Sequence, residues 1–137
     1  MKKVVYLFII IFLVVLVPYM YWKIERKLLY AQTYAGISSI EAALINEFKN
    51  NNKCVELFFK CNNSRINTKK YYELIDFLSQ KNNLDIPKNY LDPFGSPYII
   101  DYQVKKNNLL IHVHSKNIKE KFDKHKYIVI KGFLGIH

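Results

Sequence analysis

The sequence predicts an α+β protein in which one long N-terminal helix packs on a small head containing an antiparallel β-sheet. Two observations lead to this fold class. Residues 4–48 follow a helical pattern without a break, and residues 98–115 have the alternating pattern of a β-hairpin. Once the first, strongly apolar segment is set aside, about 110 residues remain, which is enough for one small domain and too few for two.

Residues 4–22 have the properties of a membrane span. They include no charged side chain and end against a charged segment at residues 23–27. As a helix they would be about 28 Å long, close to the thickness of the hydrocarbon layer, whereas the apolar core of a signal peptide has about 7–15 residues. We therefore expect a single transmembrane helix at 4–22, preceded by a short cytoplasmic N-terminus at residues 1–3.

Residues 23–48 are expected to continue the same helix outside the membrane, because no proline interrupts them. Small and apolar side chains recur on one side of this segment at 3.6 residues per turn. This helix stripe consists of Leu29, Thr33, Gly36, Ile40, Ala43 and Leu44. Glycine costs about 1 kcal/mol of helix propensity relative to alanine, so Gly36 indicates that another segment packs closely there. A break of the helix at Gly36 is the alternative.

The formal net charge of +10 is spread along the chain, without a dense basic run. Such a balance is typical of a lysine-rich solvated surface and also fits weak attraction to a polyanion. The basic residues on the two sides of the apolar segment favour an N-terminus in the cytoplasm and a head, residues 49–137, outside it.

Cys54 and Cys61 would then lie in a compartment where disulfides persist, and six residues between them suffice to close a small loop. A disulfide is one interpretation, and two reduced thiols are the other. Because no histidine stands at a paired spacing from these cysteines, we expect no metal site with them.

The helix is expected to end at the asparagines 50–52, which are poor helix formers. Residues 55–59 are apolar except for Glu56 and fit either a short strand or a hydrophobic plug beneath the helix. Asn67 is expected to cap a second helix that continues to about Lys81. Its buried face should consist of Tyr71, Leu74, Ile75 and Leu78.

The segment 91–98, LDPFGSPY, predicts a rigid corner. Asp92 can accept hydrogen bonds from nearby backbone N–H groups, Pro93 fixes φ, Gly95 can adopt a positive φ, and Pro97 starts an extended run. The side chains that define this corner are Asp92, Pro93, Phe94, Gly95, Pro97 and Tyr98.

Two strands, at 98–104 and 109–115, are expected to follow as a hairpin with its turn at 105–108, and 127–131 looks like a last strand. His112 and His114 lie on one face of the second strand. Two histidines so placed can bind a metal, but without a visible third ligand we expect them to be exposed to solvent.

Three segments carry a resemblance to a known family. Leu16-Val17-Pro18 resembles the proline-containing end of a pilin membrane segment, and residues 35–48 look like the helix that leads into a pilin head. The corner is similar to an Asp-Pro-Trp-Gly-x-Pro-Tyr motif, with Phe94 in the place of Trp. The chain thus resembles a type IV pilin-like protein, more closely the major pseudopilin of type II secretion systems.

The resemblance implies a structural or accessory subunit of a type II secretion or type IV pilus-like system in the bacterial cytoplasmic (inner) membrane. Such a subunit acts by helix packing and assembly with other pilin-like subunits or an assembly platform, needs no cofactor and is not an enzyme. The sequence agrees, because it contains no recognisable nucleophile–base pair or phosphate-binding loop.

The chain also departs from the family. No glycine precedes Gly36, so a prepilin peptidase has no site there, and residues 4–22 lack the family's early glutamate. We therefore expect residues 1–3 to be retained and the protein to stay inserted as an anchor; a start codon assigned too far downstream is the alternative. A calcium site is not expected either, because Asp123 lies among lysines.

A second functional hypothesis is a membrane-anchored basic module that binds nucleic acid or another polyanion weakly. Tyr102 and Tyr127 would be available for stacking on bases. The expected basic contacts are Lys105, Lys106, Lys116, Lys119, Lys121, Lys124 and Lys126.

Overall fold

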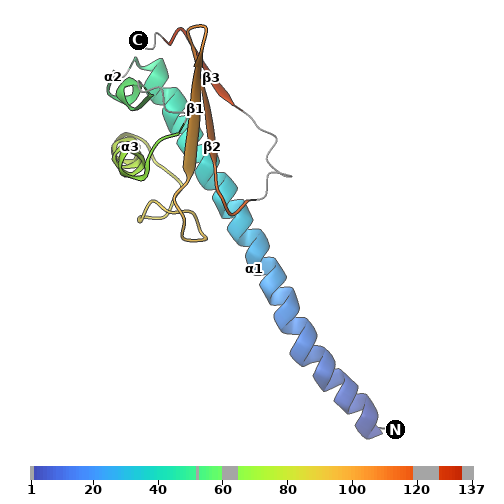
Figure 1. The fold of residues 1–137 in the computed structure, drawn as a ribbon. Helices are drawn as coiled ribbons and strands as arrows, with labels where there is room; N and C mark the ends of the chain where they lie inside the picture. Colours follow the sequence, from blue (N-terminus) through green and yellow to red (C-terminus); the bar gives the residue numbers. More distant parts are fainter. Residues whose placement is uncertain (1, 52, 60–64, 119–126, 134–137) are drawn as a thin grey trace.

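The computed structural model describes residues 2–51, 53–59, 65–118 and 127–133. Its elements, in order, are α1 (Lys2–Lys49), α2 (Lys53–Glu56), the 3-10 turn η1 (Leu57–Phe59), α3 (Thr68–Lys81), β1 (Ile99–Lys105), β2 (Asn108–His114) and β3 (Ile128–Lys131). The predicted α+β class, with a long N-terminal helix and an antiparallel sheet, is confirmed (Figure 1).

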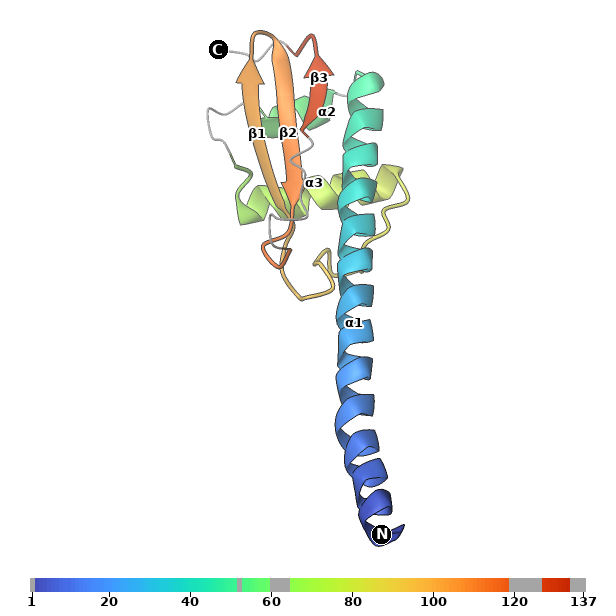
Figure 2. The same cartoon turned by 90° about the vertical axis from the view of Figure 1, so that its right-hand side faces the viewer.

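Helix α1 is continuous over its whole length, with Pro18 and Gly36 inside it. The expected continuation to about residue 48 is therefore confirmed, and the alternative of a break at Gly36 is wrong. The first half of α1 projects from the head, and in both ribbon views none of the other described elements lies beside it (Figures 1 and 2). This half is long and apolar enough to cross a membrane.

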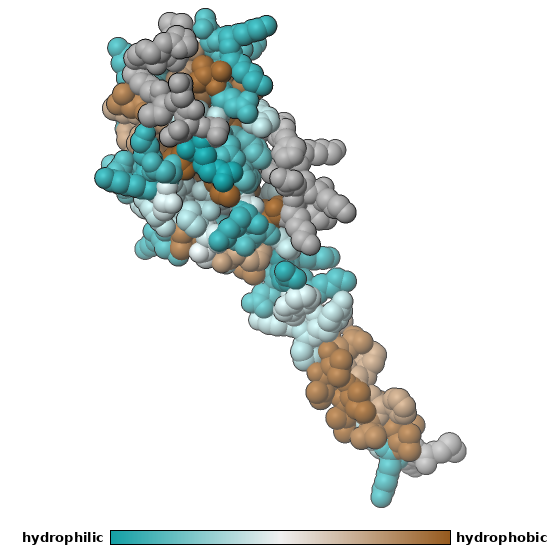
Figure 3. Space-filling view, in the orientation of Figure 1, coloured by the Kyte–Doolittle hydropathy of each residue, from teal (hydrophilic) through white to brown (hydrophobic). Residues whose placement is uncertain are grey.

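The side chains of the projecting half face outward on all sides. Its large apolar residues between positions 4 and 22 are exposed, from 38% at Leu16 to 70% at Tyr21. In the space-filling view this half forms a hydrophobic rod, and the part of α1 nearer the head is more polar (Figure 3). The apolar surface is thus concentrated at one end of the molecule.

The segment after α1 is helical. Residues 55–59 belong to α2 and η1, so of the two interpretations the strand is wrong. Val55 and Phe59 are buried, and the ring of Phe59 lies 5.6 Å from that of Phe48 and 5.1 Å, edge-on, from that of Tyr102. These residues close the end of the core beneath the last turns of α1.

Helix α3 begins and ends as its sequence predicts. The side chain of its N-cap residue, Asn67, accepts a hydrogen bond from the backbone N–H of Lys70 at 2.9 Å. Its buried residues are Tyr71, Leu74, Ile75 and Leu78. The helix therefore lays one apolar face on the inner side of the sheet, and Figure 2 shows it passing behind the strands.

The sheet is antiparallel, with strand order β1-β2-β3. Lys106 and Asn107 join β1 to β2 with positive φ at both positions, 46° and 65°, as a tight type I′ turn requires. One face of the sheet is buried. Its inner residues are Ile100, Tyr102, Leu109, Ile111 and Val113, and they pack against α3 and the second half of α1.

Candidate functional site: the corner and the helix it rests on

The structure places most of the helix stripe in the head. Thr33, Gly36, Ile40, Ala43 and Leu44 are buried, and Leu29, at the end nearer the apolar segment, is half-buried. The hydroxyl of Thr33 donates to the carbonyl of Leu29 at 2.8 Å, so this polar side chain is satisfied within the helix. The second half of α1 is thereby part of the domain core, whereas its first half is not.

Asp92 organises the corner from a buried position. Its Oδ1 accepts hydrogen bonds from the backbone N–H groups of Phe94, at 3.0 Å, and Ser96, at 2.8 Å. Its Oδ2 accepts from the hydroxyl of Ser115, at 2.5 Å, and the amide of Asn117, at 3.0 Å. A carboxylate that is only 2% exposed requires such partners, because an unpaired buried charge is costly.

The backbone of the corner is closed on itself. The N–H of Asp92 donates to the carbonyl of Ser96, the N–H of Gly95 donates to the carbonyl of Asp92, and Leu91 pairs with Pro97 in an isolated β-bridge. Gly95 has φ +80°, a conformation that side chains with a Cβ rarely adopt. Because Ser115 directly follows β2, Asp92 also ties the corner to the far end of the hairpin.

The corner contacts α1 through two aromatic residues. The ring of Phe94 lies 5.4 Å from that of Tyr30, and Tyr98 lies against Gly36, where no side chain intervenes. Pro93 lines a groove together with Leu29 and other residues of α1. The corner thus rests on α1 between its apolar half and the turns that are buried in the core.

The hydroxyl of Tyr98 is buried in this contact. It has no hydrogen-bond partner among the residues that the structure describes. Burial, together with the nearby carboxylates of Asp92 and Asp85, raises the pKa of Tyr98 to about 12. The phenol is therefore held neutral against the helix backbone.

The histidine pair does not lie as expected. His112 is buried, at 7% exposed, and His114 is half-buried, so the expected solvent exposure is wrong. The two imidazole rings stack at 4.8 Å, and Asp101 of β1 lies beside them. We call Asp101, His112 and His114 the Asp–His–His cluster. The third member was missed because it belongs to the neighbouring strand.

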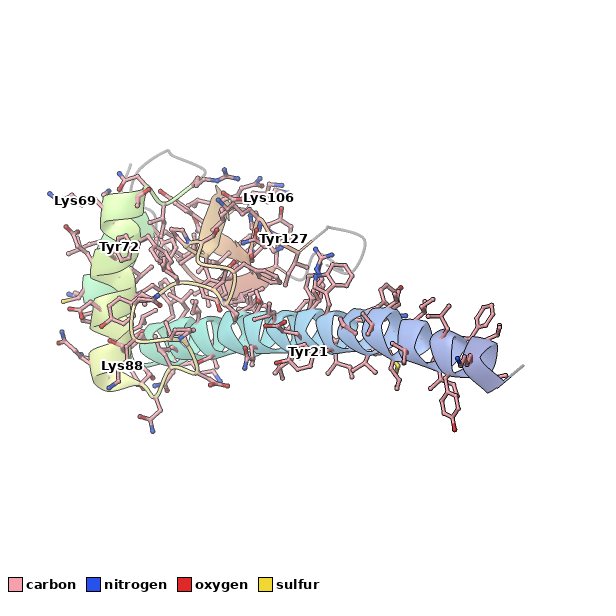
Figure 4. The ribbon with its side chains drawn as sticks, turned by 90° about the horizontal axis from the view of Figure 1, so that it is seen from below. Tyr21, Lys69, Tyr72, Lys88, Lys106 and Tyr127 are labelled. Carbon is pink, nitrogen blue, oxygen red and sulfur yellow. The ribbon has the colours of Figure 1, made fainter. Side chains whose placement is uncertain are left out.

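Among the residues proposed for polyanion binding, those that the structure describes do not form one accessible surface. Tyr102 is buried in the core at 4% exposed, so it is not available for stacking on a base. Lys105 and Lys106 lie at the tight turn, and Lys116 follows β2, whereas Lys119, Lys121, Lys124 and Lys126 lie outside the described residues. Figure 4 shows Lys69, Lys88 and Lys106 projecting from different parts of the head. These described lysines do not form a common surface.

The cysteine prediction lies partly outside the described residues. Cys54 is exposed on α2, and Cys61 belongs to the segment that is not described. The alternatives of a disulfide and two thiols therefore both stay predictions.

Comparison with protein-family models, with curated proteins and with solved structures finds no match.

Proposed function

We propose that this chain is a membrane-anchored, pilin-like structural or accessory subunit that acts by lateral helix packing. One observation carries the proposal: the second half of one continuous helix is packed in the core of the head, and its first half projects as an exposed apolar rod (Figure 3). The resemblance of the corner to the pseudopilin motif supports the same function.

The exposed rod needs a covering. Leaving one large apolar side chain in water instead of burying it costs about 1.5–3 kcal/mol, and many such residues are exposed between positions 4 and 22. Lipid chains or the helices of neighbouring subunits supply the apolar surroundings. In this proposal lipid chains surround the first half of α1 before assembly, when it is an anchor. In the assembled state the helices of neighbouring subunits pack against it.

The corner determines how the head sits on the rod. Its contacts to Tyr30 and Gly36 lie about two to four turns beyond the apolar segment, and a small tilt there would displace the head of every subunit in an array. A corner closed by a buried carboxylate suits this purpose, since its hydrogen bonds leave little freedom for the loop. The head would thus set the spacing while α1 provides the attraction.

Site-directed photo-crosslinking in the native membrane tests the proposal. A photoreactive amino acid is introduced at successive positions from 8 to 22 of the full chain, and the matched control carries it at Tyr72, an exposed residue of α3 in the head. We expect alkaline-resistant membrane association and crosslinks between copies of this chain that recur with helical periodicity in α1.

The control position should give few crosslinks between copies. A chain that is recovered in the soluble fraction would contradict the anchor. A chain that is in the membrane but gives no protein crosslink from any α1 position would contradict packing between subunits.

A further inference from the structure

The Asp–His–His cluster lies on the face of the sheet opposite the inner residues that pack against α3, at the end of β2 that is nearer the corner. Asp101 and His112 are directly opposite each other in the antiparallel register, and His114 is two residues further along β2, so all three side chains emerge on one face. Each offers one ligand atom, and these three atoms lie within 4.8 Å of one another.

We propose that this cluster binds a divalent transition-metal ion, Zn²⁺ in the first instance, through one nitrogen of each histidine and one oxygen of Asp101. Two imidazoles and one carboxylate are a donor set that zinc accepts, and a water molecule would complete a tetrahedral coordination. The site is distinct from the assembly function proposed above and does not depend on it.

The distances fit a metal after a small adjustment. Bonds of about 2.0–2.1 Å in a tetrahedron place two ligand atoms about 3.3 Å apart. His114 Nε2 and Asp101 Oδ2 are 2.9 Å apart, so this pair must open by a few tenths of an ångström. The widest pair, at most 4.8 Å, must close by about 1.5 Å, which side-chain rotation can supply.

Two groups must move when the metal enters. The hydrogen shared by His114 Nε2 and Asp101 Oδ2 leaves that position, either to the other nitrogen of the ring or to solvent. Arg65 donates to both oxygens of Asp101, from Nε to Oδ1 at 2.6 Å and from its terminal nitrogen to Oδ2 at 3.1 Å. Because the Arg65 side chain is 60% exposed, it can turn into solvent and give up Oδ2 at little cost.

The surroundings of the two histidines hold their rings in a defined arrangement. The two imidazole rings are nearly parallel, with an angle of 14° between their planes, and the ring of Tyr127 lies 5.4 Å from that of His112. Figure 4 shows Tyr127 on the side of the head that faces α1. A metal held here would join β1 to β2 beyond their hydrogen bonds, so binding should stabilise the head.

The test uses the full chain in detergent micelles, stripped of metal with a chelator. Titration with Co²⁺, which takes zinc sites and reports its geometry by visible absorption, should give one equivalent with tetrahedral bands. Free Zn²⁺ at a hundred times its Kd should raise the Tm by roughly 10 °C. Stripped wild-type protein that shows neither change would overturn the proposal without any variant.

Variants then assign the ligands. His112→Gln, His114→Gln and Asp101→Asn should each weaken Co²⁺ binding at least a hundredfold, since even supporting residues around a metal ligand typically contribute 10–100-fold. The matched control replaces the other two histidines, His125→Gln with His137→Gln, and should retain the tetrahedral bands. Far-UV circular dichroism without metal checks that each variant is folded.

The opposite pattern would overturn the assignment. If folded His112→Gln and His114→Gln proteins bind Co²⁺ as wild type does, or if the control loses binding, the metal is held elsewhere in the chain.

Discussion

The phenol ring of Tyr98 lies so close to the backbone of Gly36 that a Cβ at residue 36 would be 2.1 Å from its hydroxyl oxygen and 2.8 Å from its Cζ. Both distances are shorter than real Cβ contacts. The second involves the ring itself, which a simple rotation of the hydroxyl hydrogen cannot relieve. The glycine in the middle of α1 is therefore explained by what packs on it, as the helix stripe predicted, and not by a break in the helix.

Gly36→Ala should destabilise the head. Helix propensity alone would favour alanine by up to about 1 kcal/mol, but the added methyl group overlaps the Tyr98 ring, and overpacking typically costs 1–3 kcal/mol. We expect a net loss of about 1–2 kcal/mol in the free energy of unfolding, measured with urea on the full chain in micelles. Ala42→Gly, at an exposed position of the same helix, is the control for propensity and should cost about 1 kcal/mol.

A double-mutant cycle assigns the effect to Tyr98. In a Tyr98→Leu background the ring is absent, so Gly36→Ala should become neutral or stabilising, with a coupling energy of about 1 kcal/mol or more. If Gly36→Ala stabilises the wild-type protein, or if the two changes are additive, the proposed contact between the ring and the helix is not what selects glycine.

The raised pKa of Tyr98 predicts a loss of stability at high pH. Its pKa is about 12 in the folded protein and about 10 in the unfolded chain, so between these values the unfolded state has lost a proton that the folded state retains. The contribution of the neutral phenol is complete below pH 10 and decreases as the pH rises from 10 to 12, by up to about 1.4 kcal/mol per unit.

Tyr98→Phe provides the comparison, because it removes the titrating group and also the buried hydroxyl without a described partner. The variant should be at least as stable as wild type at neutral pH and should lose less stability between pH 10 and 12. Equal slopes of unfolding free energy against pH in the two proteins would contradict the prediction.

Local sequence signals were sufficient to predict the start of α3 and the corner. Asn67 ends a polar stretch directly before a helical period, and the corner has proline and glycine where its turns need them, so these positions follow from residue chemistry alone. The same signals could not decide between strand and helix at residues 55–59. Four apolar residues and Glu56 fit both periods there, and the burial of Val55 and Phe59 depends on α1 and the sheet.

Asp101, the third member of the Asp–His–His cluster, was missed for a different reason. It is eleven and thirteen residues from the two histidines along the chain and meets them only through strand register, although the predicted turn at 105–108 already implied that Asp101 and His112 are opposite each other. The burial of Tyr102 follows from the same register, because it is paired with Ile111 on the inner face. Pairing the hairpin before judging single residues would have found both.

Asp92→Asn should loosen the corner. The asparagine amide nitrogen cannot accept a hydrogen bond, so one side of the group would face donors that previously bound a carboxylate oxygen. Hydrogen bonds to a charged group contribute about 1.5–3 kcal/mol each, and we expect a loss of roughly 2–4 kcal/mol in unfolding free energy. Asp76→Asn is the comparison: Asp76 is exposed on α3, and although Gln80 and Tyr90 donate to its carboxylate, its substitution should cost less than that of the buried Asp92.

Loss of the corner should also be visible locally. Hydrogen exchange at the backbone amides of Phe94 and Ser96 should increase in Asp92→Asn, since these amides donate to its carboxylate. Unchanged exchange at both amides, or stability equal to that of the Asp76→Asn control, would show that Asp92 does not hold the loop.

The contact between Phe94 and Tyr30 should couple the corner to α1 about two turns beyond the apolar segment. The rings are 5.4 Å apart and inclined at 53°, a geometry in which aromatic pairs contribute about 0.5–1.5 kcal/mol beyond the area they bury. Phe94→Ala and Tyr30→Ala should therefore show a coupling energy of about that size in a double-mutant cycle, measured by unfolding of the full chain in micelles.

Phe94→Trp is the informative companion, because tryptophan occupies this place in the pseudopilin-like motif that the corner resembles. If the corner has the same relation to its helix, the larger ring should be accepted at the half-buried position with a change below about 1 kcal/mol. In a Trp22→Phe background, which removes the native tryptophan, the fluorescence of the new tryptophan should be quenched less by aqueous iodide than that of an exposed tryptophan. A control cycle between Tyr30→Ala and Phe133→Ala, which pairs with Phe48 instead, should be additive. Additivity of the Phe94 and Tyr30 changes as well would mean that these two rings do not couple the corner to α1.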